Sequence, residues 1–361
     1  MTPIKFKSNS TAQLDFAKTL KERVQHYFTS NNIAQTANSA MVIKTIVMVG
    51  LYIVPFILVL TLNLSLFWAL IMAIIMGFGI AGTGMGVMHD ACHGSYSNKK
   101  WVNDLLGGSL YLLGSNVLNW KIQHNVLHHT YTNLAGIDED IATKGPIRLS
   151  SSTPLKKYHK FQFVYAFFFY GLMTITKLIN DFTNLYRYAK EGYVKQMRVA
   201  IKPEYIKMIV RKAIYLLLIF GLPLVFTSYT WYQIFIGFFI MHWVASIILS
   251  FIFQMAHVVE GADQPQIAEA NETNWFVHQL KTTADFARNN KLMSWYVGGL
   301  NFQIEHHLFQ NICHIHYPKI APIVQATAKE FGIPYNLKPS FTSALVSHIT
   351  MLKYYGQAQQ A

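Results

Sequence analysis

The sequence predicts an all-α membrane protein with four transmembrane helices in two hairpins and a cytoplasmic helical cap that carries a metal site. The 361-residue chain is 52% hydrophobic and only 13% charged, whereas soluble domains carry roughly 25% charged residues. No Asp, Glu, Lys or Arg occurs between Lys44 and Asp90, or between Lys212 and Glu260. Eight histidines are gathered near and beyond the ends of these two stretches, which predicts the metal site.

Each charge-free stretch is long enough for a helical hairpin. Both exceed 40 residues, and one membrane-spanning helix needs about 20. We expect hairpins over about 41–84, turning near Asn63, and about 213–257, turning near Ser228. A soluble protein with two large buried helices is the alternative, and two such long stretches disfavour it.

The positive charges predict the orientation of these hairpins. Lys and Arg number six up to Lys44, seventeen from Lys99 to Lys212 and seven afterwards, with none in the two expected turns. Cytoplasmic loops carry the excess of Lys and Arg, so we expect both termini and segments 85–212 and 258–340 in the cytoplasm. The net charge of +13 then indicates attraction to anionic lipid. No motif for binding nucleic acid accompanies it.

Three parts of the chain follow from this pattern. Residues 1–40 are polar, but Phe16, Leu20, Val24 and Phe28 have helical spacing, which predicts a cytoplasmic amphipathic helix lying on the membrane. Residues 41–340 form the expected integral-membrane domain. Residues 341–361 are expected to be a C-terminal tail.

The histidines form three clusters and one isolated position. The i, i+4 spacing within the first two clusters places two rings on one helical face. A catalytic ion takes at most about six ligands and keeps one position open, so eight imidazoles suit two ions. Adjacent histidines lie about 100° apart on a helix and could serve different ions. The clusters are HDACH (His89, His93), HNVLHH (His124, His128, His129) and QIEHH (His306, His307), with His257 ending the second apolar stretch.

The identity of the metal stays open at this point. Imidazole suits iron, zinc and copper, and zinc, which has no redox chemistry, would indicate hydrolysis or a structural site. Metal-bound histidines usually give their second N–H to a polar neighbour. For the acidic run at 138–140, a solvated turn is the alternative to this role as a partner of metal-bound histidines. Candidates for such neighbours are Asp90, Asn125, Asp138, Glu139, Asp140 and Glu305.

The three clusters, with the stretches FQMAHVVE and QIEHHLFQNICHIHYP, resemble the membrane fatty acid desaturases from about residue 40 to 340. Gln303, in place of the first histidine of the third cluster, is similar to the front-end subgroup. Those enzymes insert a double bond between an existing one and the carboxyl end. The resemblance implies a set of iron ligands with Gln303 as a candidate ninth. The others are His89, His93, His124, His128, His129, His257, His306 and His307.

The resemblance also implies the reaction and its partners. It implies O₂-dependent desaturation of a long fatty acyl chain, as acyl-CoA or acyl-lipid, of the linoleoyl-CoA or delta-6 kind, with two iron ions. The chain has no His-Pro dipeptide, and hence no haem motif of the fused cytochrome b5 domain that many front-end members carry. A separate electron donor of the cytochrome b5 or ferredoxin type is therefore expected, as in bacterial members, and so is a bacterial cytoplasmic membrane.

Three other functions share some of these features. A lipid hydroxylase could use the same ligands, and a zinc-dependent membrane hydrolase could use some of them. A metal transporter would need ionisable groups along its helices. The charge-free hairpins offer only His242, which argues against transport.

Overall fold

The computed structural model describes residues 6–8, 10–142 and 145–358. Regular structure in these ranges is helical except for one parallel pair of two-residue strands, β1 (Asp285–Phe286) and β2 (Leu337–Lys338). The chain divides into two compact units. We call Asn38–Ile122 with Phe168–Ser250 the membrane unit, and Met1–Ala37, Gln123–Phe167 and Phe251–Ala361 the cap unit. The predicted all-α class is confirmed.

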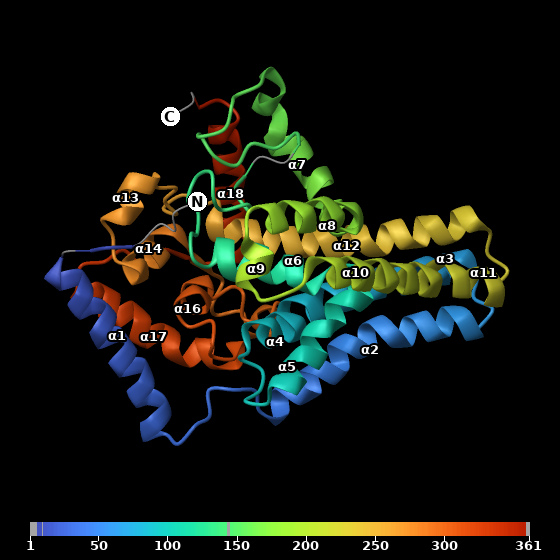
Figure 1. The fold of residues 1–361 in the computed structure, drawn as a ribbon, viewed down its shortest axis with the longest axis horizontal. Helices are drawn as coiled ribbons and strands as arrows, with labels where there is room; N and C mark the ends of the chain where they lie inside the picture. The colour runs from blue at the N-terminus through green and yellow to red at the C-terminus, as the bar shows by residue number, and fades with distance from the viewer. Residues whose placement is uncertain (1–5, 9, 143–144, 359–361) are drawn as a thin grey trace. The chain divides into compact units, whose positions relative to one another are not determined.

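Four helices among the described residues are long and apolar enough to cross a membrane, as predicted. In the first hairpin, α2 (Ser39–Thr61) lies beside α3 (Leu66–Gly82), as Figure 1 shows, and the turn includes Asn63. The second turn includes Ser228. The second and third spans each consist of several elements, and the fourth is a single helix. The second span continues through η1 (Thr83–Met88) and α4 (His89–His93), the third is α10 (Ile201–Leu216), η5 (Leu217–Gly221) and α11 (Leu222–Phe226), and the fourth is α12 (Trp231–His257).

Two of the candidate helices extend beyond the expected hairpin boundaries. The third span begins at Ile201, twelve residues before the expected 213, and includes Lys212. The Lys212 ammonium is buried, and it donates to Asp181 at 2.8 Å and to the carbonyl oxygen of Gly114 at 2.8 Å. Because its charge is paired, this lysine can lie inside the helix. The charge-free stretch, which begins after Lys212, is therefore shorter than the helix. The second span likewise continues past 84 to His93, so the first histidine cluster lies on the span itself.

Buried polar contacts fix the segment that leads to the second histidine cluster. Asp181 of α8 (Met173–Lys190) accepts from the backbone N–H of Asn116 at 2.9 Å. Asn116 caps α6 (Val117–Lys121) by accepting from the N–H of Asn119. Asn119 in turn donates to the carbonyl oxygen of Asp181 at 2.7 Å. The start of α6 is thereby held on α8, and the chain continues directly from α6 into η3 (Ile122–His128).

The N-terminal helix does not offer its apolar face to a membrane. In α1 (Thr11–Ser30) the residues Phe16, Leu20 and Val24 are buried, and they share a hydrophobic core with Ile320 and Val324 of α17 (Tyr317–Glu330). The two helices run side by side in the cap unit (Figure 1). The predicted helix is present, but its apolar stripe packs on another helix, so the expected placement on the membrane is corrected.

The C-terminal segment is a packed helix rather than a tail. In α18 (Phe341–Tyr355), His348 is buried and donates from Nδ1 to the carbonyl oxygen of Val258 at 2.8 Å. Ser347 accepts from the backbone N–H of Glu260 at 2.9 Å. These contacts hold α18 against the residues that follow His257. The other helices are α5 (Lys100–Gly107), η2 (Gly108–Leu113), η4 (Lys157–Phe161), α7 (Gln162–Tyr170), α9 (Tyr193–Gln196), α13 (Ile267–Asn271), α14 (Trp275–Thr282), α15 (Lys291–Tyr296), α16 (Gln303–Leu308) and η6 (His314–His316).

Candidate metal centre

The second histidine cluster lies on a π-helical turn, which the sequence pattern did not predict. The N–H of His129 donates to the carbonyl oxygen of His124 at 2.9 Å, an i to i+5 bond that replaces the α-helical one. The Nε2 atoms of His124 and His129 are consequently 3.1 Å apart. We expected His124 to share a face with His128, as in an α-helix. The two rings are indeed stacked, with centroids 5.4 Å apart, and the wider turn in addition brings His124 together with His129. Single π turns of this kind occur frequently at functional sites.

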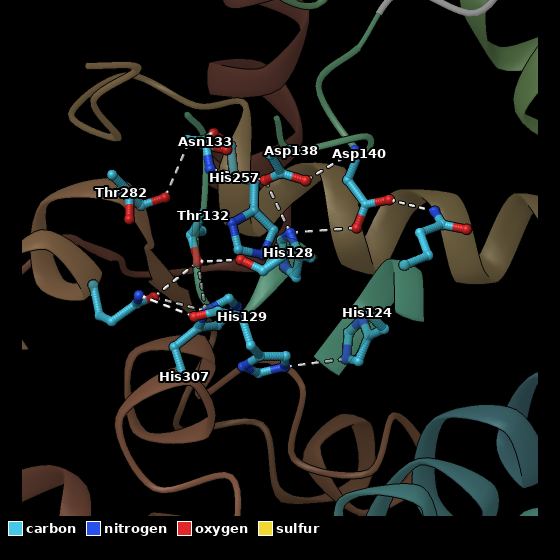
Figure 2. A network of polar contacts seen from close by, with 12 residues as sticks. His124, His128, His129, Thr132, Asn133, Asp138, Asp140, His257, Thr282 and His307 are labelled. Carbon is cyan, nitrogen blue, oxygen red and sulfur yellow. Dashed lines mark hydrogen bonds and ion pairs between the residues drawn. The ribbon is translucent and has the colours of Figure 1, made fainter. Parts of the chain in front are cut away.

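Six histidines of the cap unit fall into two groups. Ligand nitrogens of His124, His129 and His306 lie within 4.8 Å of one another, and so do those of His128, His257 and His307. The ring planes of the neighbours His128 and His129 are 81° apart, and those of His306 and His307 are also 81° apart. Each adjacent pair therefore contributes one ring to each group. Figure 2 shows five of these rings.

His128 is oriented by carboxylates. Its Nδ1 lies 3.0 Å from Asp138 Oδ2 and 3.3 Å from Asp140 Oδ2. Asp138 is itself held by the backbone N–H groups of Asn133 and Asp140, at 2.8 and 2.9 Å (Figure 2). Within the described ranges, the buried Nε2 of His128 has no hydrogen-bonding partner. A histidine with a carboxylate on one nitrogen and the other one available is the usual form of a metal-binding histidine.

The carboxylates also change the protonation of this ring. Burial of His128 opposes a positive charge, but Asp138 and Asp140 outweigh it and raise the pKa of His128 to about 9. Burial also opposes a charge on Asp138, but the ring of His128 and two backbone N–H groups lower the pKa of that carboxyl. Asp138 therefore remains a carboxylate at neutral pH and increases the basicity of the His128 ring as a ligand.

Other buried groups, which were not among the candidates from the sequence, contact further histidines of the site. Gln279 Oε1 lies 2.9 Å from Nδ1 of His307, and the Tyr317 hydroxyl lies 3.2 Å from Nδ1 of His306. Asn133 donates from its side chain to the carbonyl oxygen of His257 at 2.8 Å. Asn133 lies in the stretch HHTYTN just after the second cluster, which was the one available hint. Tyr317 lies in the stretch QIEHHLFQNICHIHYP, but nothing in that pattern indicated its contact with His306, and Gln279 belongs to no recognisable pattern.

The first cluster belongs to the membrane unit. His89 and His93 lie one turn apart on α4, as expected, with ring centroids separated by 4.7 Å. The indole of Trp120 lies close to both rings, at centroid distances of 5.7 and 5.9 Å. His242 in α12 is also buried in this unit, where it hydrogen-bonds to Tyr215 at 2.5 Å and to Thr174 at 2.8 Å.

Gln303 lies on the same short helix as the third cluster. It is buried on α16, three residues before His306. Its side chain lies beside the His257 ring and acts to raise the pKa of that ring, against the lowering by burial. The expected nearness of Gln303 to the histidines is therefore present within the cap unit.

The remaining polar candidates differ in their surroundings. Glu305 accepts from the Tyr335 hydroxyl at 2.9 Å and pairs with Asp285, away from the six rings. Burial and the neighbouring Asp285 raise the pKa of Glu305 well above its ordinary value, which favours its neutral form. Asp138 and Glu139 are buried, so the run at 138–140 is no solvated turn. Asn125 lies partly buried on η3, and Asp90 lies buried on α4.

The cap-unit residues fit metal ions on three grounds. The donors are imidazole nitrogens, which bind iron, zinc and copper. Two nitrogens bound at right angles to one ion at about 2.1 Å lie about 3 Å apart, and Nε2 of His124 and Nε2 of His129 are separated by 3.1 Å. The buried Nε2 of His128 has no other partner among the described residues. The arrangement therefore suits one ion for each group.

The carboxylate behind His128 gives a first prediction. In Asp138→Asn the side chain keeps its shape but loses its charge, so the ring becomes a weaker ligand. We expect metal affinity to fall by about 10–100-fold, as is typical when such a partner is lost. Elemental mass spectrometry of purified protein at limiting metal measures this, and thermal unfolding checks that the fold is retained. Unchanged metal affinity in a folded variant would contradict the role of Asp138.

Comparison with known proteins identifies the family. The family model described as fatty acid desaturase matches residues 64–339. The chain is 33% identical over 355 residues to the sn-1 linoleoyl-lipid 6-desaturase of Arthrospira platensis, covering 98% of this chain and 96% of that protein. It is 31% identical to the protein of the same name from Synechocystis sp., covering 96% and 97%. It is 35% identical to an acyl-lipid (8-3)-desaturase of Physcomitrium patens, covering 95% and 72%. The two histidine groups and the four apolar spans are thus those of a multi-pass membrane protein that belongs to the fatty acid desaturase family.

Proposed function

We propose that this enzyme inserts a double bond into a long fatty acyl chain of a membrane lipid, between an existing double bond and the carboxyl end, using O₂ and two iron ions. One observation carries the two-ion part of the proposal. The adjacent histidines at 128–129 and at 306–307 separate into two groups of ligand nitrogens. A single ion would not need such a division, whereas two neighbouring ions require it.

We assign the ligands as follows. His124, His129 and His306 bind one ion, and His128, His257 and His307 bind the other, in line with the distances between their nitrogens. His89 and His93 are proposed as further ligands because of their one-turn spacing and their resemblance to the first cluster of the family. Gln303 is proposed as a ninth ligand or as a direct neighbour of the ions.

The residues of the chain prepare the site for oxidative chemistry. Bound iron would supply the O₂-dependent redox chemistry that removal of two hydrogens from adjacent methylenes requires. Neutral imidazoles add no negative charge, so the site stays electrophilic. Asp138 and Asp140 fix the ring of His128, and burial of all six cap-unit histidines excludes water from the reacting groups.

Three observations support a lipid-linked substrate and a separate reductant. The relatives in Arthrospira platensis and Synechocystis sp. carry names that specify a linoleoyl lipid, and each aligns with this chain over nearly its full length. The four apolar spans indicate a protein embedded in a bilayer, which is where such lipids occur. The same two relatives have little sequence beyond the part that aligns with this chain, and we propose a cytochrome b5 or ferredoxin type donor as a separate protein.

The product identifies the reaction. In a host with a defined fatty acid pool supplied with linoleic acid, we expect a fatty acid with one additional double bond on the carboxyl side. Gas chromatography–mass spectrometry measures it. His307→Gln should abolish the product because it removes a ligand. His348→Gln, at an equally buried histidine outside both groups, should keep it. A hydroxylated product would instead identify a lipid hydroxylase, and zinc without iron dependence would identify a hydrolase.

The orientation of the spans has its own test. We propose the bacterial cytoplasmic membrane with both termini in the cytoplasm, because the seventeen Lys and Arg from Lys99 to Lys212 contrast with none in the two turns. Reporter fusions at Asn63 and Ser228 should lie on the outer side, and fusions at Ser151 and the C-terminus on the inner side. An outer-side signal at Ser151 would overturn this topology, because the second and third clusters would then be separated by a membrane.

Gln303 gives a fourth prediction. Because it shares a helical face with His306 and lies beside His257, we expect Gln303→Ala to lose about 10–100-fold in activity, with reduced iron content. Gln303→His should restore iron binding because imidazole is a stronger ligand than an amide oxygen. Activity of purified enzyme and elemental analysis together measure this. Full activity with full iron content in Gln303→Ala would show that the residue is only a spacer.

A further inference from the structure

We propose that Gln279 is a positioning residue that fixes the tautomer of His307, so that Nδ1 carries the proton and Nε2 presents its lone pair to the metal. The inference rests on the proposed metal site, but the tautomer itself is a property of the metal-free protein. Gln279 lies on α14, which carries none of the proposed ligands. Its amide nevertheless contacts two of the histidine clusters.

The contacts of Gln279 involve both ends of its amide. Oε1 lies 2.9 Å from Nδ1 of His307 and accepts from the Thr132 hydroxyl at 2.8 Å. Nε2 donates to the backbone carbonyl oxygen of His129 at 3.2 Å. Gln279, Thr132 and His307 are all fully buried. Because buried polar groups require partners, these few contacts determine where each hydrogen lies.

The backbone carbonyl of His129 sets the direction of the whole chain of hydrogen bonds. A carbonyl oxygen accepts and never donates, so the amide nitrogen of Gln279 must face it. The amide oxygen then faces Nδ1 of His307, and this oxygen also only accepts. Nδ1 must therefore be the donor, and a neutral imidazole with Nδ1–H carries its lone pair on Nε2.

The opposite arrangement is unfavourable at two points. Turning the amide over would place its oxygen 3.2 Å from the carbonyl oxygen of His129, which gives two acceptors facing one another. Keeping the amide and moving the ring proton to Nε2 would place a lone pair of Nδ1 2.9 Å from Oε1. The Thr132 hydroxyl also lies 3.1 Å from Nδ1 of His307, but its single hydrogen has closer acceptors at 2.8 Å in Gln279 Oε1 and the carbonyl oxygen of His128. The second cluster thus determines how the third cluster binds metal.

The first experiment reads the tautomer directly. Nitrogen-15 NMR of histidine-labelled, metal-free protein distinguishes a protonated Nδ1 from a protonated Nε2, and His307→Gln identifies the signal. We expect Nδ1–H in the wild type and a shift toward Nε2–H in Gln279→Met, which has similar length but no acceptor. A wild-type His307 with its proton on Nε2 would overturn the proposal, whether or not the enzyme desaturates lipids.

The second experiment measures metal binding with Co²⁺ as the probe. Because His307 belongs to one of the two groups, Gln279→Met should weaken one of two Co²⁺ ions by about 10–100-fold and change the visible spectrum of that ion. In Gln279→Glu the buried carboxyl, once protonated, can donate to the carbonyl oxygen of His129 and still accept from Nδ1–H, so this variant should bind both ions. Equal affinity for both ions in the wild type and in Gln279→Met would contradict the proposal.

A matched substitution separates this role from simple packing. Gln162 is also fully buried in the cap unit, where it hydrogen-bonds to Arg148 and to the carbonyl oxygen of Leu352 at 2.7–2.8 Å. Gln162→Met should lower the unfolding temperature but leave two Co²⁺ ions bound and His307 protonated on Nδ1. If Gln162→Met also weakened a single ion and shifted the tautomer, the effect of Gln279 would be that of any buried amide.

Discussion

Every buried imidazole in the cap unit needs a polar partner for one ring nitrogen, and that partner determines which nitrogen is available to a metal. Asp138 occupies Nδ1 of His128, Gln279 occupies Nδ1 of His307, and Tyr317 occupies Nδ1 of His306. The three partners come from separate segments of the chain. The metal site therefore depends on the fold of the whole cap unit, and single partners determine the chemistry of single ligands.

The π turn of η3 also contributes to the metal site, because it determines which histidine rings meet. A one-residue widening of the helix brings His124 and His129 together and leaves His128 facing His257 and His307. The rings of His124 and His128 remain stacked at 5.4 Å, so the two groups of ligand nitrogens lie directly beside one another. A second π turn, η1, lies directly before His89 in the membrane unit. The first histidine cluster therefore directly follows a π turn, and the second cluster lies on one.

The sequence was sufficient for the features that depend on local pattern. Long charge-free stretches identified four spans and both turns, since hydropathy identifies the helices that can cross a bilayer. The helix of the third span begins earlier than expected. The expected start followed Lys212, but this lysine is paired with Asp181, 31 residues away, and lies inside the helix. The packing of α1 on α17 was not predicted, because an apolar stripe can be covered equally well by another helix or by lipid. Gln279 and Thr132 were missed because they meet His307 from positions 28 and 175 residues away.

The central claim is that adjacent histidines bind different ions, and counting and locating the metal tests it most directly. Purified protein loaded with iron should hold two ions per chain by elemental mass spectrometry. X-ray absorption should show nitrogen-dominated ligation and a second iron near the first. Replacing His129 with Gln should weaken one ion, and replacing His128 with Gln should weaken the other. A single ion per chain, lost equally in both variants, would contradict the account.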